Sequence, residues 1–270
     1  MSSNPSVTSE FLATRESLSG AIAAGQLIQH YQPIVDLASS CMVGCESLMR
    51  WEHPLEGTVA ACEFSELLER TRLVDTLTAR LIHEACLLAA ELSPAGARRF
   101  VSVNMSPAQL SDPALVSLVD QELDEAGIEG DQLTLEITEY SAFDDIDVAA
   151  KVLARLRELG VKIALDDFGT GHSSLIKLKQ LPISVLKLDR QFVTNLPDDT
   201  DDIAIVGSVI SLAASLGVEC VAEGVETKEQ AQSLRLLGCD RAQGHLFAPA
   251  LPRQTLLAGV GYDNRARLAG

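Results

Sequence analysis

The sequence predicts an α/β fold, a (β/α)8 barrel of the TIM type whose first strands form an irregular N-terminal hairpin. Eight short apolar runs rich in Val, Ile and Leu are typical of buried strands. Helical segments separate most of these runs, and the length of 270 residues is near the ~250 residues usual for this barrel. An open doubly wound sheet is the alternative that these patterns leave open.

The strand-like runs extend along nearly the whole chain. We expect strands at residues 30–37, 42–49, 100–105, 132–138, 162–168, 185–189, 219–225 and 241–247. Only the short polar stretch ASS before Cys41 separates the first two, so they are expected to form a hairpin that enters the barrel. The later runs alternate with helices, as parallel strands require.

The clearest helix is expected at residues 147–159, with the sequence DVAAKVLARLREL. Its apolar residues recur at the spacing of one helical face, and Gly160 follows as a stop signal. Similar patterns occupy residues 107–126, 202–216 and 228–237. Because no linker divides them, we expect one barrel at residues 18–252, with a tail and lead-in helix at 1–17 and a tail at 253–270.

Composition argues against several classes of function. The 38 acidic residues outnumber the 21 basic ones, and a net charge of −17 would repel a nucleic-acid polymer. The longest uncharged run, residues 203–218, is too short and too polar for membrane insertion, and the N-terminus does not have the pattern of a secretory signal. The six cysteines form no CxxC pair, which indicates reduced thiols in a cytoplasmic protein and no zinc site.

Polar residues stand at or near the carboxyl ends of most predicted strands. They are Glu46, Asn104, Glu136, Asp166, Asp167, Lys187, Glu223 and Gln243. Each alone would be interpreted as a solvent-exposed strand end, but in a barrel these ends meet on one face, where barrel enzymes place their chemistry. Converging carboxylates repel one another unless cations lie between them. Oxygen ligands without a His or Cys cluster favour Mg2+ or Mn2+.

Two adjacent aspartates end a strand in the segment IALDDFGTGHSSL, residues 163–175. Inside a half-buried strand neighbouring side chains point to opposite faces, whereas at the end of a strand both can turn toward one ligand. A structural aspartate pair at a turn is the alternative. If one aspartate bridges two ions and the other binds one of them, Asp166 and Asp167 predict a pair of ions ~3.5–4 Å apart, a separation used to activate water against phosphodiesters.

The ordered motifs of the chain closely resemble the EAL-domain family. They are Glu46-Ser47-Leu48 with Arg50-Trp51 and His53-Pro54, Asn104 in SVNMSP, Glu136 and Glu139 in LEITE, Asp166 and Asp167 in DDFGTG, Lys187 and Asp189 in LKLD, Glu223 in AEGVE, and Gln243-Gly244. The resemblance runs from about residue 18 to residue 251. It implies an enzyme, a cyclic di-GMP phosphodiesterase, that hydrolyses this bacterial second messenger to linear 5′-pGpG.

The resemblance also implies roles for single residues. The implied metal ligands are Glu46, Asn104, Glu136, Asp166, Asp167 and Glu223. Lys187 is implied to position or activate the attacking water, in a catalytic group with Glu46, Asp166 and Asp167. The residues implied to contact the nucleotide are Gln32, Leu48, Arg50, Asn104, Asp189 and Gln243. Glu139, Gly169 and Gly171 are implied to support the loop after Asp167, which in the family often connects the site to a dimer interface, so a homodimer is expected.

The chain departs from the family pattern at a few positions. Ser47 stands where the family has alanine, a small-for-small change that adds one hydroxyl. Arg72 replaces a usual glycine in the helix after the first motif, His172 replaces a usual aromatic residue, and residues 247–251 do not have the common basic-proline pair. These departures leave the efficiency of turnover open.

Two other functions remain open at this stage. A non-hydrolysing cyclic di-GMP receptor would be favoured by the loss of a metal ligand, yet every implied ligand position holds a suitable side chain. An unrelated barrel enzyme that acts on an enolate would also use a lysine base and carboxylate-bound Mg2+, but the ordered SVNMSP, DDFGTG and AEGVE segments argue against it. The sequence predicts neither the input signal nor the physiological metal.

Overall fold

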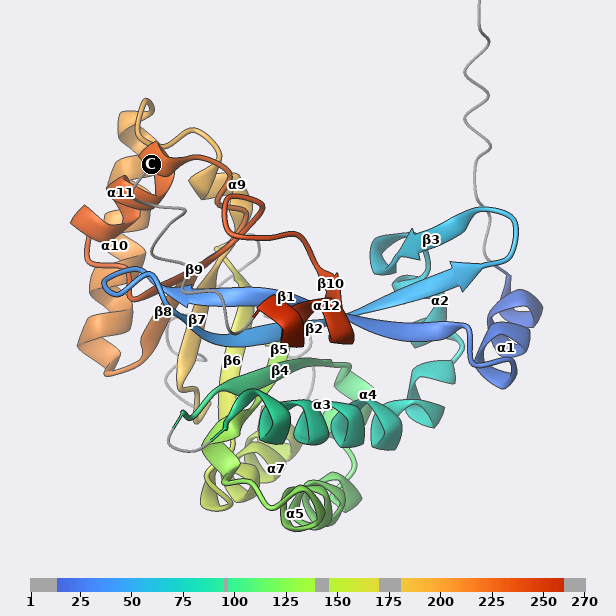
Figure 1. Ribbon diagram of the computed structural model, residues 1–270. Helices are drawn as coiled ribbons and strands as arrows, with labels where there is room; N and C mark the ends of the chain where they lie inside the picture. The colour runs from blue at the N-terminus through green and yellow to red at the C-terminus, as the bar shows by residue number, and fades with distance from the viewer. Residues whose placement is uncertain (1–13, 95–96, 139–145, 170–180, 260–270) are drawn as a thin grey trace, which may run out of the picture. The chain divides into compact units, whose positions relative to one another are not determined.

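The computed structural model describes residues 14–94, 97–138, 146–169 and 181–259 (Figure 1). The strands are β1 (Leu27–Asp36), β2 (Met42–His53), β3 (Gly57–Ala60), β4 (Phe100–Met105), β5 (Leu133–Thr138), β6 (Lys162–Phe168), β7 (Val185–Leu188), β8 (Glu219–Ala222), β9 (Arg241–Gln243) and β10 (Leu251–Pro252). The α-helices are α1 (Arg15–Ala23), α2 (Ser65–Arg70), α3 (Thr78–Leu92), α4 (Pro107–Leu110), α5 (Ala114–Ala126), α7 (Ile146–Glu158), α9 (Arg190–Val193), α10 (Thr200–Leu216), α11 (Lys228–Leu236) and α12 (Arg253–Gly259). The 3-10 helices are η1 (Ala61–Glu63), η2 (Leu73–Thr76) and η3 (Gly130–Gln132).

The chain divides into two compact units. The smaller contains the residues up to 28 and residues 49–76, and the larger contains residues 29–48 and those from 77 onward. The larger unit is a closed barrel, in which the strands follow the order β1-β9-β8-β7-β6-β5-β4-β2 and the pairing of β1 with β2 completes the ring. This closure confirms the predicted (β/α)8 class and excludes the open sheet.

The first strand of the barrel runs against the others. Neighbouring strands from β2 through β4 to β9 are parallel, whereas β1 is antiparallel to β9, with Ile34 opposite Gln243. The short β10 also pairs antiparallel with β1, at His30 and Tyr31. The reversed β1 and its pairing with β2 are the irregular hairpin that the short ASS stretch predicted.

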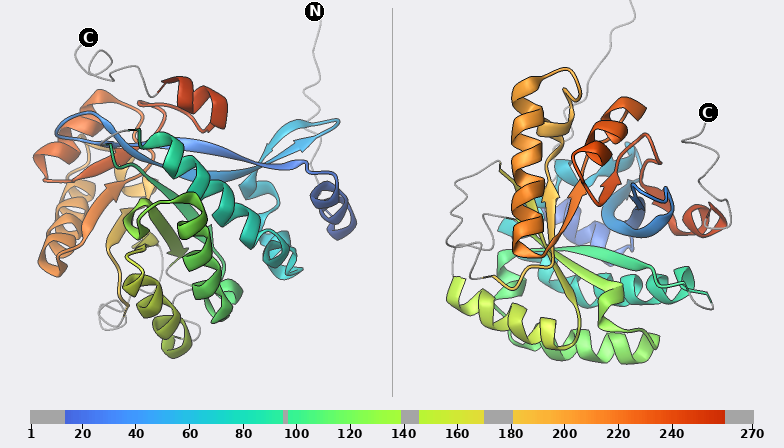
Figure 2. Two further views of the ribbon diagram at one scale, coloured as in Figure 1. Left: turned by 60° about the horizontal axis from the view of Figure 1, so that its bottom comes forward. Right: turned by 90° about the vertical axis from the view of Figure 1, so that its left-hand side faces the viewer.

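Helices α3, α5, α7 and α10 lie along the outside of the barrel (Figure 2). Helix α7 shows how the sequence places them. Its Val152, Leu153 and Leu156 are almost fully buried and recur at helical spacing, so one apolar stripe packs inward while the charged residues stay outside. The helix predicted at residues 147–159 is thereby confirmed to within one residue at each end.

The interior of the barrel is filled beneath the carboxyl ends of the strands. Ile34, Phe100, Ala164, Val185 and Val221 form a buried apolar cluster there. At the amino ends of the strands, Glu219 pairs with Lys162 at 3.1 Å and with Arg241 at 2.8 Å. The guanidinium of Arg241 lies 5.2 Å from the centre of the Phe100 ring. The carboxylates that could hold an ion lie at the opposite, carboxyl ends of the strands.

The helix expected at residues 107–126 is wrong, because the segment forms two helices. Helix α4 ends at Leu110 and α5 begins at Ala114. Pro113 lies between them and has no N–H with which to continue the helical hydrogen bonds. Strands β8 and β9 also end earlier than expected, at Ala222 and Gln243, and the short strands β3 and β10 were not expected.

The smaller unit contains a hairpin of its own. Strand β3 pairs antiparallel with the end of β2, from Arg50 opposite Ala60 to His53 opposite Gly57. Trp51 is buried beneath this hairpin, where its Nε1 donates to Gln26 Oε1 at 3.1 Å.

Arg72 lies between α2 and η2 and not within a helix, which corrects the sequence-based expectation. Its φ is 56°, in the left-handed region where glycine avoids the steric cost of a Cβ atom. This conformation accounts for the glycine that is usual at the position. The Arg72 side chain is exposed and pairs with Asp75 at 2.9 Å.

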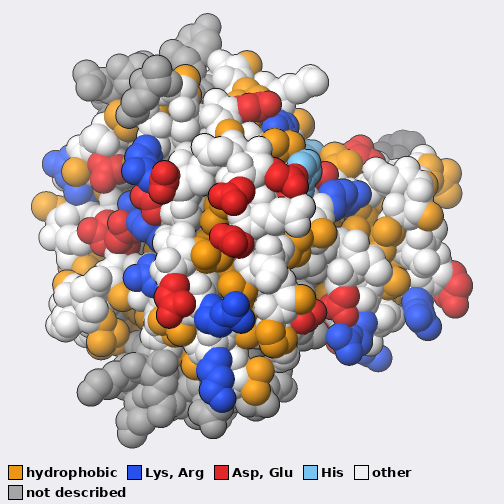
Figure 3. Space-filling view, turned by 90° about the horizontal axis from the view of Figure 1, so that it is seen from below, with side chains coloured by type: hydrophobic (Ala, Val, Ile, Leu, Met, Phe, Trp, Pro, Cys, Tyr) orange, Lys and Arg blue, Asp and Glu red, His pale blue; other side chains and the backbone are white. Residues whose placement is uncertain are grey.

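Charges of both signs are interspersed over the face drawn in Figure 3. No helix in the described part of the chain has the length and apolar character needed to cross a membrane.

Candidate active site

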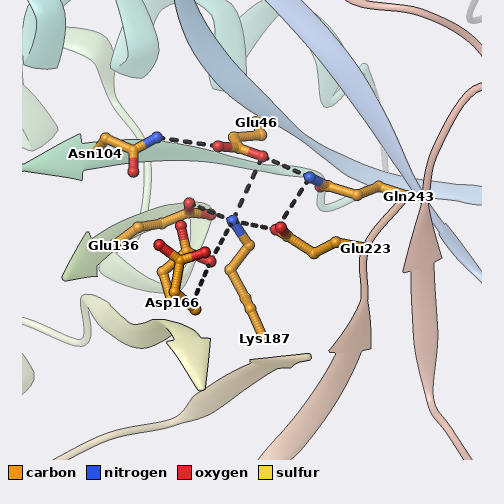
Figure 4. A network of polar contacts seen from close by, with 8 residues as sticks. Glu46, Asn104, Glu136, Asp166, Lys187, Glu223 and Gln243 are labelled. Carbon is orange, nitrogen blue, oxygen red and sulfur yellow. Dashed lines mark hydrogen bonds and ion pairs between the residues drawn. The ribbon is translucent and has the colours of Figure 1, made fainter. Parts of the chain in front are cut away.

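Polar side chains from seven strands or strand ends meet at the carboxyl ends of the barrel strands (Figure 4), where Glu136 and Lys187 are buried and Asn104 is exposed. They are Glu46 of β2, Asn104 of β4, Glu136 of β5, Asp166 of β6, Lys187 of β7, Glu223 just after β8, and Gln243 of β9. Glu136 illustrates how a strand presents such a group: its neighbours Leu135 and Ile137 are fully buried on the outer side, so the alternation of the strand turns the carboxylate inward. The structure brings these residues together, as the sequence predicts.

Lys187 occupies the centre of this group. Its Nζ lies 2.6 Å from Glu136 Oε2, 2.6 Å from Glu223 Oε1, 3.2 Å from Asp166 Oδ1 and 3.4 Å from Glu46 Oε2. Its side chain is only 2% exposed. Burial opposes the charge of the ammonium, but the surrounding carboxylates outweigh that effect and raise the pKa of Lys187 well above its ordinary value. Lys187 is therefore a hydrogen-bond donor and a positive charge in this site.

Two amide side chains hold Glu46 from both sides. Asn104 Nδ2 donates to Glu46 Oε1 at 3.0 Å, and Gln243 Nε2 donates to Glu46 Oε2 at 2.6 Å. Gln243 Nε2 also lies 3.2 Å from Glu223 Oε1. Burial opposes ionisation of Glu46, yet Lys187 and these amides together lower its pKa. Gln243, implied by the resemblance to contact the nucleotide, thus orients two carboxylates.

Glu136, Glu223 and Asp167 are harder to ionise. Burial and the charge of Glu46 raise the pKa of Glu136 well above its ordinary value. Burial raises the pKa of Glu223 to about 8, even though Lys187 acts in the opposite direction. Burial and the charge of Asp166 raise the pKa of Asp167 to about 6. One lysine is therefore too little positive charge for this set of carboxylates.

The adjacent aspartates leave the strand by an irregular backbone. The register between β6 and β7 shifts between Leu165 and Phe168, and Asp167 has a φ of 55°. Aspartate is among the few residues that adopt this left-handed conformation readily. Asp166 Oδ1 accepts from the backbone N–H of Asp167 at 3.0 Å. The irregularity lets both carboxylates face the same side, which a regular strand would forbid.

The carboxylates form two groups that could each hold a metal ion. Glu46, Glu136 and Asp166 make one group, and Asp166, Asp167 and Glu223 make the other. Within each group, oxygen atoms from the three residues lie within 4.8 Å of one another. All the donors are hard oxygens, which suit Mg2+ or Mn2+. Asp166 belongs to both groups.

The remaining predicted residues have different surroundings. Gln32 of β1 donates from Nε2 to the backbone oxygen of Ala248 at 3.2 Å, and Leu48 of β2 is half-buried. Asp189 caps the short helix α9, since its Oδ1 accepts from Gln191 N at 2.8 Å. Gly169 is described and has a φ of 96°.

Three predicted site residues, Arg50, Glu139 and Gly171, are not among the described residues of the larger unit. Arg50 belongs to the smaller unit, where its Nη1 donates to the backbone oxygen of Met49 at 2.9 Å. Glu139, Gly171 and His172 lie outside the described residues.

Gly224, which directly follows Glu223, was missed by the sequence-based reasoning. It has a φ of 66°, and a Cβ atom at this position would lie 2.4 Å from the Cβ of Arg190. Only glycine allows this close approach of the loop after β8 to helix α9. The signal was present as the glycine within AEGVE, directly after a polar strand end.

Ser47, the departure from the family alanine, has a partner on β1. Its hydroxyl donates to Gln29 Oε1 at 2.8 Å, and both residues are buried. The added hydroxyl is therefore satisfied, and it lies on the opposite side of β2 from Glu46. The change leaves the carboxylate centre as it is.

Comparisons with known proteins agree with this geometry. A family model described as EAL domain matches residues 15–250. The bifunctional diguanylate cyclase/cyclic di-GMP phosphodiesterase MucR of Pseudomonas aeruginosa is 40% identical over 252 residues. That match covers 93% of this chain and 37% of MucR, so the chain spans well under half the length of this relative.

Solved structures are similar over most of the chain. The PaMucR phosphodiesterase in its c-di-GMP complex has a TM-score of 0.84 and 40% identity, with 89% of this chain and 98% of that chain covered. The manganese/cy-diGMP complex of Klebsiella pneumoniae BlrP1 has a TM-score of 0.73 and 30% identity, with 84% and 57% covered.

Proposed function

The chain belongs to the EAL domain family, and on that premise we propose that it is a metal-dependent phosphodiesterase that hydrolyses cyclic di-GMP to linear 5′-pGpG. The observation that carries the proposal is the pair of carboxylate groups that share Asp166 around a buried lysine. A protein that only bound the ligand would have no need to gather five mutually repelling carboxylates, three of them buried, because such burial is strongly unfavourable without cations.

The metal ions of the proposal are two Mg2+ or Mn2+. Glu46, Asn104, Glu136 and Asp166 would hold one, and Asp166, Asp167 and Glu223 the other. When bound, such ions polarise the phosphodiester and lower the pKa of water. With all five carboxylates ionised, Lys187 leaves a formal charge of −4, which two divalent cations balance. The manganese in the BlrP1 complex supports this choice.

The protein residues would orient the reaction that the ions support. Water attacks one phosphorus atom, the bond from that phosphorus to a ribose 3′ oxygen breaks, and the 3′ oxygen takes a proton. Lys187 would donate a hydrogen bond to the attacking water, and the carboxylates around it support its charged form. Gln243 and Asn104 would keep Glu46 and Glu223 oriented toward the ions.

Other residues are proposed to contact the nucleotide or support the loop. Gln32, Leu48, Arg50, Asp189 and Gln243 are the proposed nucleotide contacts, and Glu139, Gly169 and Gly171 the proposed loop supports. Arg50 suits a phosphate oxygen because guanidinium binds oxyanions with two parallel hydrogen bonds. A homodimer in the cytoplasm, where this second messenger acts, completes the proposal.

Product analysis tests the function directly. The protein is incubated with cyclic di-GMP and Mn2+ or Mg2+, and linear 5′-pGpG is measured by chromatography while ligand affinity is measured by calorimetry. We expect product with either metal and none in a chelator. Lys187→Ala should lower the rate by ~10²–10⁴-fold with little loss of ligand affinity, whereas Glu46→Ala should weaken metal binding as well. Binding of cyclic di-GMP without product, in the presence of metal, would reject the enzyme and support a receptor.

A further inference from the structure

The ammonium of Lys187 is surrounded by more acceptors than it has donors. It carries three N–H groups, while carboxylate oxygens of Glu136, Glu223, Asp166 and Glu46 all lie within 3.4 Å of Nζ. The contacts at 2.6 Å to Glu136 and Glu223 have the length of strong charge-assisted hydrogen bonds. Lys187 thus binds oxygens from four different strands or strand ends at once (Figure 4).

The same carboxylates make up the two candidate metal groups. Glu46, Glu136 and Asp166 belong to the first group, and Asp166 and Glu223 belong to the second. An ion bound to either group would therefore compete for oxygens that now contact Lys187. Lys187 contacts both groups, because Asp166 belongs to both and its Oδ1 is 3.2 Å from Nζ.

We propose that Lys187 is the internal counter-ion of the metal-free site and that it competes with divalent cations for these oxygens. The proposal rests on the metal site of the proposed function but not on hydrolysis. Buried carboxylates without a cation strongly oppose folding, so a resident ammonium lets the barrel close before any ion binds. Binding of an ion then breaks some Lys187 contacts and places the ion near a positive charge. Both effects make the ions bind less tightly than the carboxylates alone would hold them.

Replacing Lys187 by methionine separates these effects, because methionine keeps much of the length and removes the charge. Manganese binding is measured by calorimetry on wild type and Lys187→Met, without substrate. We expect the dissociation constant of Lys187→Met to fall at least ~10-fold, since one repelling charge is gone. In urea with a chelator, the unfolding midpoint of Lys187→Met should be lower than that of wild type. Added Mn2+ should raise the midpoint more in the variant than in wild type.

Lys162→Met is the matched control. Lys162 begins β6 and pairs with Glu219 at the amino ends of the strands, where its side chain is 25% exposed. This control should leave the manganese affinity unchanged. If Lys187→Met does not fold in a chelator, Lys187→Gln purified with Mn2+ and titrated with a competing chelator gives the same comparison.

The manganese measurements test the counter-ion role of Lys187 separately from hydrolysis. Unchanged or weaker manganese binding in Lys187→Met would overturn the counter-ion role, even if the wild type makes 5′-pGpG. Tighter binding in the variant would support that role, even if the wild type makes no product. A wild type that does not bind Mn2+ would overturn both.

Discussion

Asparagine substitutions at the two adjacent aspartates should affect the metal ions unequally. Asp166 belongs to both carboxylate groups, whereas Asp167 belongs to one. Asp167→Asn should therefore weaken the binding of one ion, and Asp166→Asn should weaken the binding of both. The backbone tolerates each change. Asparagine adopts the φ of 55° seen at Asp167, and in Asp166→Asn the amide oxygen can still accept the N–H that Asp166 Oδ1 now binds at 3.0 Å.

The structure sets the expected size of the two effects. Loss of a side chain that only supports a metal ligand typically costs ~10–100-fold in affinity, so loss of a direct carboxylate ligand should cost at least ~100-fold, or about 2.7 kcal/mol. Asp167→Asn should lose this metal-binding free energy at one ion. Asp166→Asn should lose it at each of two ions, about 5.5 kcal/mol in total.

Calorimetric titration with Mn2+ measures both affinity and stoichiometry. We expect two ions for wild type, one tightly bound ion for Asp167→Asn, and no ion bound at wild-type affinity for Asp166→Asn. Asp131→Asn is the control, since Asp131 pairs with Arg98 at an exposed site. Two tightly bound ions in Asp167→Asn, or one in Asp166→Asn, would refute the shared role of Asp166.

Three further predictions concern the loop after β8, the substituted family alanine, and the choice of metal. Gly224→Ala should lower the free energy of unfolding by about 2–5 kcal/mol, from the left-handed φ and the 2.4 Å approach to the Arg190 Cβ; in urea denaturation Arg190→Gly should restore the steric part, and no coupling in that double-mutant cycle would contradict the contact. Ser47→Ala should cost about 1–3 kcal/mol, because Gln29 Oε1 loses its 2.8 Å donor, and equal unfolding midpoints for wild type and variant would show that the bond is unimportant. Ca2+ should support little turnover, because its longer bonds and looser coordination misplace the reacting groups; chromatography that finds as much 5′-pGpG with Ca2+ as with Mn2+ would count against the site geometry.

Much of the barrel could be predicted because its strands carry a local signal. The apolar runs at residues 100–105 and 162–168 coincide with β4 and β6, since buried parallel strands are continuous apolar segments between turns. The break at Pro113 was readable in the sequence but was overridden by the helical periodicity on either side. The antiparallel direction of β1 depends on pairing with the far end of the chain, and no local pattern encodes it.

The residues of the candidate site could be predicted from the sequence, but the contacts between their side chains could not. The rule that strand ends converge in a barrel was enough to bring together Glu46, Glu136 and Glu223. It could not show that Gln243 holds two of these glutamates, or that Lys187 contacts all three. Those facts depend on side-chain rotamers and on the stagger between strands. The bend that turns Asp167 toward Asp166 is likewise a backbone irregularity that two adjacent letters do not reveal.

The reversed β1 constrains the order in which the chain can fold. This strand is synthesised before the other barrel strands and can pair with β2 at once. Its other edge pairs with β9 and β10, where Gln243 and Pro252 lie opposite Ile34 and His30. Such distant pairing is slow to form, and an unpaired strand edge meanwhile attracts other chains. A nascent chain that stalls ahead of Arg241, or one cut there by a protease, is therefore an open sheet in which β1 and β8 each have an unpaired edge. Fragments of this kind are expected to aggregate or be degraded, so the barrel closes only once translation has delivered its last strands.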